Sequence, residues 1–271
     1  LIINVGTGED ETRARIAKFA AEEGAGKVLT FDSDWPMQDP VKMRGGQILS
    51  EQTNLALDRC SGDWCIYVQS DEVFHEEDIE KVRTSLAEAD RDSRVDGLVF
   101  DYLHFYGSFD VIQQSRSAYR REVRAIRRKS GARSVGDAQS FRMPDGSKVP
   151  AIRARGARVF HYGWVRPPEA MREKTVFMDQ LYHGGAKQGQ TVPFTGENYR
   201  YKRFVGLKRY EGTHPSVMRE RIRSRNWKWN LEESPLVWTL GDWKKIVLDG
   251  FEALSGIRLF EYRSYRWIKE D

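Results

Sequence analysis

Short apolar runs alternate with amphipathic segments along the first hundred residues of the chain. The runs at 1–5, 28–31, 64–68 and 97–100 are predicted strands, and the run at 64–68 is aromatic and β-branched, which is typical of a strand that is buried on both faces. The segments between these runs carry apolar side chains at helical spacing. This repeated strand–helix order predicts a mostly parallel sheet with helices on both of its faces.

The pattern changes in the second half of the chain. Residues 102–159 contain shorter apolar runs separated by turns, as antiparallel strands do. Beyond the two prolines at 167–168, apolar residues fall on helical stripes, the last of which lies within 243–254. We therefore predict an α/β, Rossmann-like fold with a small antiparallel extension and a helical C-terminal region. The change divides the chain into regions 1–165 and 166–271.

The composition is that of a globular protein with a mild basic excess. Of the 271 residues, 39% are hydrophobic and 12% are aromatic, which is enough for one large core or two small ones. The net charge of +4 and the pI near 9.0 favour an anionic substrate or surface without requiring nucleic acid. Cys60 and Cys65 lack metal-type partners in the sequence, which indicates ordinary buried thiols in a reducing compartment.

The sequence shows neither a transmembrane span nor a signal peptide. No apolar segment approaches the ~20 residues that a membrane helix needs, and no secretory pattern opens the chain. We expect a cytoplasmic protein, with peripheral association at the inner face of the membrane as an alternative. The chain opens inside an apolar strand, Leu1–Val5, without an initiator Met, which predicts a fragment that lacks an upstream element.

Two adjacent acids follow the apolar run at 64–68. Asp71 and Glu72 stand between this run and a predicted helix, so they lie where the carboxyl end of a strand meets a loop. In open α/β sheets this edge is where ligands bind. Asp71 can hold a divalent cation that neutralises a diphosphate, and Glu72 either supports Asp71 or forms a salt bridge. An acid that caps the next helix is the ordinary alternative.

Two candidates stand later in the chain. His161 follows the apolar run Ala157–Phe160 and would complete an oxygen and nitrogen metal site if it faced Asp71. Asp137 lies in a turn after a basic segment, where a carboxylate can approach a substrate hydroxyl as a general base. The ordinary alternatives are a hydrogen-bonded polar histidine and a turn-forming aspartate.

Four further residues are candidates for binding a nucleotide donor. Glu9 and Asp10 open a helix after a Gly-rich turn and could accept hydrogen bonds from a base or ribose, or could be a solvated helix start. Arg44 lies in a glycine-containing loop that suits a diphosphate clamp. Asn54 lies on the helix after that loop. Without further context, Arg44 and Asn54 would be ordinary surface residues.

Together these segments resemble the inverting family-2 glycosyltransferases of the GT-A fold. The resemblance extends from Leu1 to Lys174, and more weakly to "GIRLFEYRSY". The segment "VFHYGWVRPPEAMREK" is similar to the His-Tyr-Gly element that closes the site in a subset of bacterial members acting on cell-surface glycans. The segments that carry it are, in order, "GTGEDET", "GGQILSEQTNLALDRCSGDWCIYVQSDE", "YLHFYGSFD", "GDAQSFR" and "VFHYGWVRPPEAMREK".

The resemblance implies a role for each candidate. Asp71 would be the metal-binding last residue of a D-x-D motif whose first position is Gln69, and Asp137 the base that activates the acceptor. His161 would contact the metal or the diphosphate. Region 1–165 would be the nucleotide-sugar-binding catalytic domain without its first strand and helix. The donor-binding residues would be Glu9, Asp10, Arg44, Asn54, Gln69, Asp71 and Glu72.

The implied activity is a single displacement that inverts the anomeric carbon. The donor would be a nucleotide sugar, and the acceptor a hydroxyl of a cell-surface glycan or lipid-linked saccharide in glycan biosynthesis. The cofactor would be Mg²⁺ or Mn²⁺. Gln69 stands at the first Asp position of the motif and cannot supply a carboxylate.

Two other activities compete with this interpretation. An aspartate-dependent phosphohydrolase would need a second Asp two residues after its nucleophile, and the order Gln69, Ser70, Asp71 argues against it. A non-catalytic nucleotide- or RNA-binding module would use the basic and aromatic stretches "RYKRFVGLKRYEG" and "RSRNWKWN". These stretches could also contact an acceptor or an anionic membrane, and no nucleic-acid partner is expected under the transferase interpretation.

Overall fold

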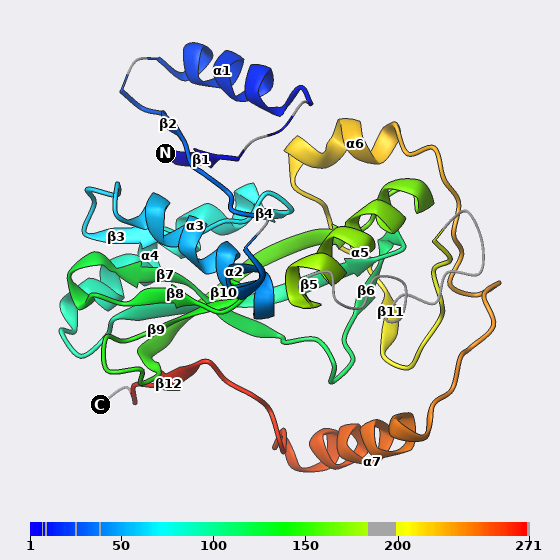
Figure 1. The fold of residues 1–271 in the computed structure, drawn as a ribbon. Coiled ribbons are helices and arrows are strands. Elements are labelled where there is room, and N and C mark those ends of the chain that lie inside the picture. Colours follow the sequence, from blue (N-terminus) through cyan, green and yellow to red (C-terminus); the bar gives the residue numbers. More distant parts are fainter. Residues whose placement is uncertain (7, 9, 25, 38, 184–198, 270–271) are drawn as a thin grey trace.

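The computed structural model describes residues 1–6, 8, 10–24, 26–37, 39–183 and 199–269. Two long strands, β5 (Gly97–Tyr106) and β10 (Val149–Trp164), pair in parallel and form the spine of an eight-stranded sheet (Figure 1). Most residues of β5 are buried, because helices cover both faces of the sheet at this point. The shorter strands of this sheet are β3 (Trp64–Ile66), β4 (Glu72–Phe74), β6 (Ser108–Gln113), β7 (Arg121–Arg127), β11 (Leu207–Arg209) and β12 (Tyr265–Trp267).

Each outer edge of the spine is shared by two shorter strands. Along β5, β7 and then β6 pair in antiparallel orientation, and β3 and β11 extend them outward, also antiparallel. Along β10, β12 pairs in parallel and β4 in antiparallel orientation. The register of β10 against β5 shifts between Arg153 and Arg158, where Gly156 takes a φ of +73°, as glycines in β-bulges do.

The mixed α/β class and the parallel centre of the sheet are confirmed, and the antiparallel part is larger than predicted. Parallel pairing joins β5, β10 and β12, whereas β3, β4, β6, β7 and β11 are antiparallel to their neighbours. One cause is local: Gly107 alone separates β5 from β6 and takes a φ of +72°. A turn this tight returns the chain beside the strand it has left.

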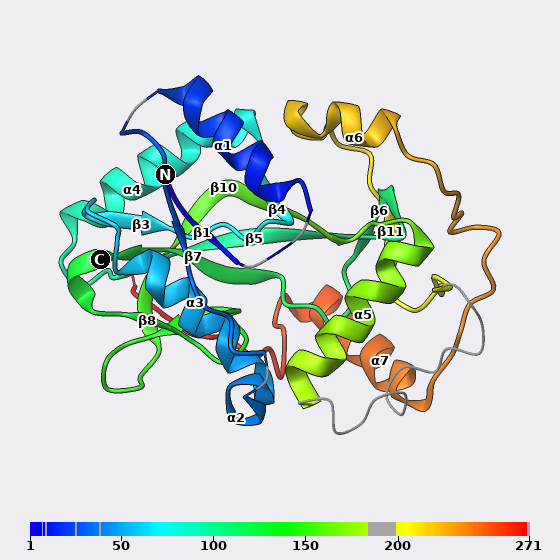
Figure 2. The ribbon, with the colours of Figure 1, turned by 45° about the horizontal axis from the view of Figure 1, so that its top comes forward.

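Helices cover both faces of the sheet, as predicted. On one face, α4 (Ile79–Arg91) packs Val82 and Ala89 against Leu98 and Phe100 of β5. On the other, Leu57 of α3 (Gln47–Leu57) packs against a cluster that contains Val99 and the buried free thiol of Cys65. Figure 2 shows α4 and α3 on opposite sides of the strands.

The N-terminal strands form a small sheet of their own. β1 (Ile2–Val5) and β2 (Leu29–Asp32) pair in parallel, and α1 (Thr12–Glu23) connects them without burying a residue. The predicted strand–helix–strand order is therefore confirmed, but these strands do not join the central sheet. Asn4 attaches the unit to α3 by donating hydrogen bonds of 3.0 Å to the backbone and side-chain oxygens of Gln52.

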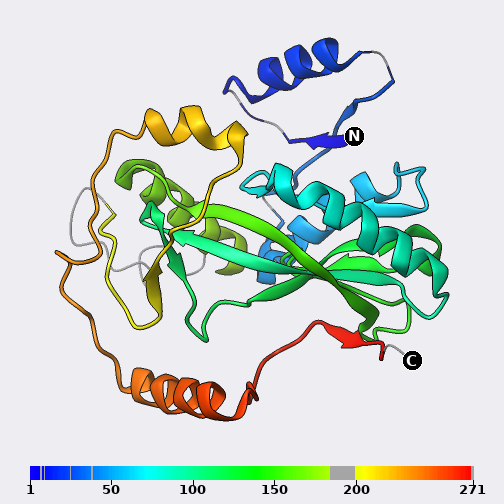
Figure 3. The ribbon, with the colours of Figure 1, turned by 180° about the vertical axis from the view of Figure 1, so that it is seen from behind.

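The C-terminal region is helical only in part, contrary to the prediction for 166–271. It contains the helices α5 (Pro168–His183), α6 (Arg219–Arg223) and α7 (Leu240–Ser255), but β11 and β12 return to opposite edges of the central sheet (Figures 1 and 3). The remaining elements are α2 (Pro40–Met43), η1 (Arg44–Gly46), η2 (Glu76–Asp78), η3 (Arg128–Ser130), η4 (Ser216–Met218) and the paired strands β8 (Arg133–Val135) and β9 (Ser140–Arg142).

A buried ion pair crosses one face of the spine. Arg124 of β7 is fully buried and donates to both carboxylate oxygens of Glu72 at the start of β4, at 3.1 and 2.9 Å. Tyr102 of β5 donates a third hydrogen bond to this carboxylate, at 2.9 Å. Since β7 borders β5 and β4 borders β10, the pair links strands on opposite sides of the spine.

Arg124→Met should lower the free energy of unfolding by about 3–5 kcal/mol, because it leaves Glu72 buried without its cation. Urea unfolding measures the change. Arg153→Met is the control, because it removes an exposed ion pair with Asp101 and should cost less than about 1 kcal/mol. Equal and small losses in both variants would contradict a structural role for the buried pair.

Candidate functional site

The loop after β3 delivers Asp71 and Glu72 to different environments. Glu72 is buried, and its carboxylate is bonded to Arg124, Tyr102 and the backbone N–H of Gln69 (3.1 Å). Of the two alternatives for Glu72, the structure shows the salt bridge. Its buried position does not favour direct contact with a donor. Gln69 is part of the same loop, and its side-chain amide donates to the hydroxyl of Tyr67 at 3.1 Å. Both residues fix the backbone that carries Asp71.

Asp71 and His161 meet the geometric condition set for a shared metal site, because their side chains come together although they are 90 positions apart in the sequence. The Nε2 atom of His161, on β10, lies 3.8 Å from Oδ2 of Asp71. The N–H of Tyr162 donates to the backbone oxygen of Asp71 at 2.8 Å, which fixes the loop against the strand. Both side chains keep a small exposed fraction, 19% for Asp71 and 12% for His161, so the pair borders solvent.

A second histidine determines which nitrogen of His161 carries the proton. Nε2 of His104 lies 2.7 Å from the carbonyl oxygen of Tyr119, so this nitrogen must be the donor. Burial lowers the pKa of His104 to about 3, so its ring is neutral and its Nδ1 accepts. Nδ1 of His161 lies 3.0 Å from that acceptor and therefore carries a hydrogen. A neutral His161 then directs the lone pair of Nε2 toward Asp71.

Two cations complete the surroundings of Asp71, and sequence reasoning missed both. Lys174 of α5 donates to Oδ2 of Asp71 at 2.9 Å and to the carbonyl of Gly163 at 3.0 Å. Arg166 is near enough for its charge to lower the pKa of Asp71, and its buried Nε has no hydrogen-bond partner among the described residues. The signal was present, because both cations lie in "VFHYGWVRPPEAMREK", from which only His161 was chosen.

These charges decide the ionisation of the site. Burial alone would raise the pKa of Asp71, but His161 when it is protonated, Lys174 through its charge and hydrogen bond, and the charge of Arg166 lower it overall. Burial lowers the pKa of His161 despite the nearby carboxylate, so the ring is neutral at pH 7. At that pH the cluster combines one carboxylate with the permanent cations Lys174 and Arg166. Its net positive charge suits an anionic ligand.

The donor atoms of Asp71 and His161 also fit a divalent cation. Metal bonds of about 2.1 Å can span two atoms 3.8 Å apart, and the lone pair of Nε2 faces the carboxylate. Among the described residues no group of three His, Cys, Asp or Glu side chains could hold a metal. Phosphate and water oxygens would have to supply the other ligands, and Lys174 would share or leave the Asp71 oxygen.

Asp137 lies beside helix α5, which contacts it through Tyr182. Its Oδ2 accepts from the hydroxyl of Tyr182 at 2.7 Å, and its Oδ1 accepts from the N–H of Gln139 at 3.2 Å. Tyr182 and Lys174 are eight residues apart on α5, which is roughly 12 Å along the axis. The helix therefore contacts both candidate carboxylates. Asp137 is half-buried, and each of its oxygens keeps a lone pair for another donor.

The contacts of Asn54, and those of the turn that contains Arg44, are with the segment around Asp137. Asn54 exchanges two hydrogen bonds with the backbone of Ser134, at 3.0 and 2.9 Å, so its amide fixes the segment that leads to Asp137. The observed contacts of Asn54 are therefore structural, and donor binding by this residue stays a prediction. Arg44 is exposed in η1, and Gly46 of that turn lies so close that a Cβ there would be 3.0 Å from the Cβ of Asp137.

The acidic turn near the N-terminus is a helix start. Asp10 is exposed and accepts from the N–H of Thr12 at 3.0 Å, and hydrogen bonds to Thr12 lower its pKa. This is the solvated alternative that the sequence left open. Glu9 lies outside the described residues.

The basic and aromatic stretches are packed into the protein. Tyr201 is buried, and Trp229 lies 5.6 Å from Tyr106 between ring centroids. Trp227 donates to the carbonyl of Gly107 at 2.9 Å. Arg209 pairs with Asp110 and Glu232. These rings therefore do not form the exposed stacking platform that an RNA-binding module would use.

Comparisons with known proteins do not identify a family for this chain. No protein-family model matches the chain, and no curated protein matches it either. Among the described residues, no helix has the length and apolar character needed to cross a membrane.

Lys174→Met should raise the folded-state pKa of Asp71, because burial then acts without its closest cation. In the wild type this pKa lies below its unfolded value, so the contact contributes stability above about pH 4 and loses it as the pH falls through the folded pKa. We expect urea unfolding to show a loss of about 1.5–3 kcal/mol at pH 7 and a smaller loss near pH 3.

The control for this variant is Lys18→Met, which removes an exposed ion pair on α1. It should change the free energy of unfolding by less than about 0.5 kcal/mol at either pH. A loss in Lys174→Met that is the same at both pH values would show that the lysine acts through packing and not through the charge of Asp71.

Proposed function

We propose that this protein transfers a glycosyl group from a nucleoside-diphosphate sugar to a hydroxyl acceptor, with inversion at the anomeric carbon. The observation that carries the proposal is the cluster of Asp71, His161, Lys174 and Arg166 where the β3–β4 loop meets the end of β10. The resemblance to family-2 glycosyltransferases supplies the reaction class, and the GT-A arrangement belongs to the same proposal.

The cluster would bind the diphosphate through its excess of positive charge. Among the described residues the Nε–H of Arg166 has no acceptor, so it could donate to a phosphate oxygen, and Lys174 can donate to a phosphate as well as to Asp71. Negative charge grows on the bridging oxygen as the bond to the anomeric carbon breaks. The attraction of both cations is therefore stronger for the leaving diphosphate than for the intact donor. Stabilisation that increases in the transition state raises turnover.

A divalent cation would fit between Asp71 and His161, as their atoms and tautomer indicate. When bound, Mg²⁺ or Mn²⁺ would neutralise part of the diphosphate charge. His104 keeps a hydrogen on Nδ1 of His161, which leaves Nε2 free to act as a ligand or as a hydrogen-bond acceptor.

Asp137 would be the general base. It would take the proton of the acceptor hydroxyl while that oxygen forms a bond to the anomeric carbon, and the bond from this carbon to the phosphate oxygen would break on the opposite face. The products are the inverted glycoside, a nucleoside diphosphate and a proton on Asp137. The hydrogen bond from Tyr182 orients the carboxylate for this step.

Asp137→Asn should lower turnover by on the order of 10²–10⁴-fold, because an amide cannot accept the proton. Nucleotide binding should hardly change, because the diphosphate cluster lies elsewhere along α5. Single-turnover transfer and calorimetric titration measure these two quantities.

A matched control for this variant is Asp145→Asn. Asp145 is an exposed aspartate that accepts from the N–H two residues later, at 2.9 Å from Ser147, as Asp137 does from Gln139. The control should leave turnover unchanged. Unchanged turnover in Asp137→Asn would remove this residue from the role of base.

Calorimetric titration with a panel of nucleoside diphosphates, with and without Mn²⁺, should detect binding of at least one nucleotide. We expect Asp71→Ala to abolish the metal-dependent part, because it removes the carboxylate ligand. Arg166→Met should weaken binding about tenfold through loss of a charge-assisted hydrogen bond.

Arg153→Met, an exposed arginine paired with Asp101, is the control for Arg166→Met and should bind as the wild type does. If no nucleoside diphosphate binds, the donor site and the catalytic roles are withdrawn together. If a nucleotide binds with the same affinity with and without Mn²⁺, Lys174 and Arg166 would be the cations that neutralise the diphosphate.

A further inference from the structure

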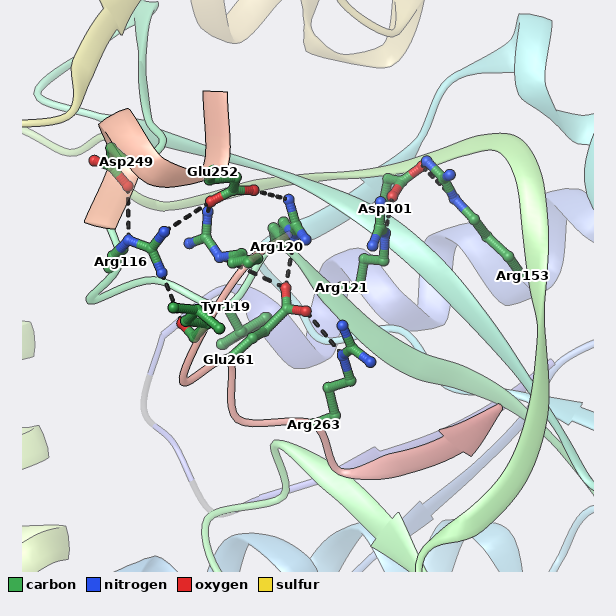
Figure 4. A network of polar contacts seen from close by, with 12 residues as sticks. Asp101, Arg116, Tyr119, Arg120, Arg121, Arg153, Asp249, Glu252, Glu261 and Arg263 are labelled. Carbon is green, nitrogen blue, oxygen red and sulfur yellow. Dashed lines mark hydrogen bonds and ion pairs between the residues drawn. The ribbon is translucent and has the colours of Figure 1, made fainter. Parts of the chain in front are cut away.

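Helix α7 is attached to the protein by its polar side. Figure 4 shows Arg116 between the helix and the body, where it contacts Asp249 at 2.7 Å and Glu252 at 2.9 Å. The same guanidinium donates to the carbonyl oxygens of Leu248 and Leu259, at 2.7 and 2.9 Å. Only 10% of the Arg116 side chain is exposed, so this is a buried polar anchor.

The other acids of this region are also used in the attachment. Arg120 pairs with Glu252 at 2.8 Å and with Glu261 at 2.6 Å, and Arg258 pairs with Glu252 at 3.1 Å. Asp242, at the start of the helix, is buried and pairs with Lys245 at 2.8 Å. The acids of α7 are therefore neutralised by neighbouring arginine or lysine side chains.

The apolar stripe of the same helix faces outward. Its residues follow one another at intervals of three or four, which places them on one face opposite the acids. Among them, Leu240 is 94% exposed, Trp243 64%, Val247 68% and Leu254 93%. These exposures show that the stripe faces away from the rest of the described protein, which reverses the usual orientation of a surface helix. The exposed apolar side chains of the stripe are Leu240, Trp243, Val247, Phe251 and Leu254.

Neighbouring residues enlarge this surface. Trp238 stacks on Trp243 with 5.7 Å between ring centroids and is itself exposed. After the helix, Phe260 is exposed although its φ of +57° is unfavourable for an aromatic residue. The ammonium of Lys244 lies 5.8 Å from the Phe260 ring centroid. The surface thus combines large apolar side chains with a cation.

We infer that α7 lies in the headgroup region of an anionic lipid bilayer, with its apolar stripe toward the acyl chains. Interfacial helices place Trp, Phe and Leu on the buried face and use basic residues near anionic lipids. Here the acids are turned toward the protein, so they do not repel a negative surface, and Lys244 is available to it. The net charge of +4 acts in the same direction.

A bilayer fits this surface better than a second copy of the chain. Two copies meeting through α7 on a twofold axis would bring their Lys244 side chains into the same interface. The helix has 16 residues and is about 24 Å long, so a single stripe is short for the roughly 800 Å² per partner of a standard interface. The inference stands independently of the proposed transfer reaction.

Sedimentation of the full chain with vesicles tests the inference. We expect binding to phosphatidylcholine vesicles that contain about 30% phosphatidylglycerol, and weaker binding in high salt or without the anionic lipid. Val247→Glu places a charge in the stripe and should reduce binding about tenfold or more. Val217→Glu is the matched control, because Val217 is 73% exposed in η4 and lies outside the stripe.

Both substitutions are at exposed positions, so equal unfolding midpoints would show that folding is intact. Absence of binding to anionic vesicles, or equal binding by the two variants, would overturn the inference. Light scattering provides the remaining outcome: dimers that Val247→Glu dissociates, without vesicle binding, would assign the stripe to a second copy of the chain. Loss of transfer activity with vesicle binding retained would bear on the proposed function alone.

Discussion

The buried pair of Glu72 and Arg124 is the interaction on which the position of the site depends. Two charges without solvent contact are tolerated only when each is paired and hydrogen-bonded, and here the guanidinium contacts both carboxylate oxygens while Tyr102 supplies a further donor. The pair spans the β5–β10 spine, so it holds the start of β4 against both central strands. Asp71 is the residue before Glu72, and its backbone is fixed by the same constraint.

The electrostatics of the cluster follow from this arrangement. The ring of Tyr102 stacks on His104 with 5.2 Å between centroids, and His104 in turn sets the tautomer of His161. Burial keeps both imidazoles neutral, so the permanent charge beside Asp71 comes from Lys174 and Arg166. If the site binds a diphosphate, as proposed, this excess of positive charge is in place before the ligand arrives, which avoids the energy cost of rearranging charges during the reaction.

The elements of the sheet and the meeting of Asp71 with His161 could be predicted from the sequence, because apolar runs define strands and strand ends share an edge. Which side of a strand or helix faces the protein interior could not be predicted. Arg124 lies in a basic segment that has the composition of a solvated surface, and only long-range pairing shows that it is buried. Helical periodicity likewise identified the stripe of α7 but not the side that faces the protein, because Arg116 determines it from another part of the chain.

Helix α5 contacts both candidate carboxylates, Asp71 and Asp137. Lys174 contacts Asp71 and Tyr182 contacts Asp137, so a rigid helix fixes the distance between the place where negative charge would leave and the place where a proton would be accepted. In the proposed inverting displacement these two groups would act on opposite faces of one carbon, and a 1 Å error in such an arrangement is costly. A helix maintains that spacing better than two independent loops would, because its hydrogen bonds fix the rise of every residue.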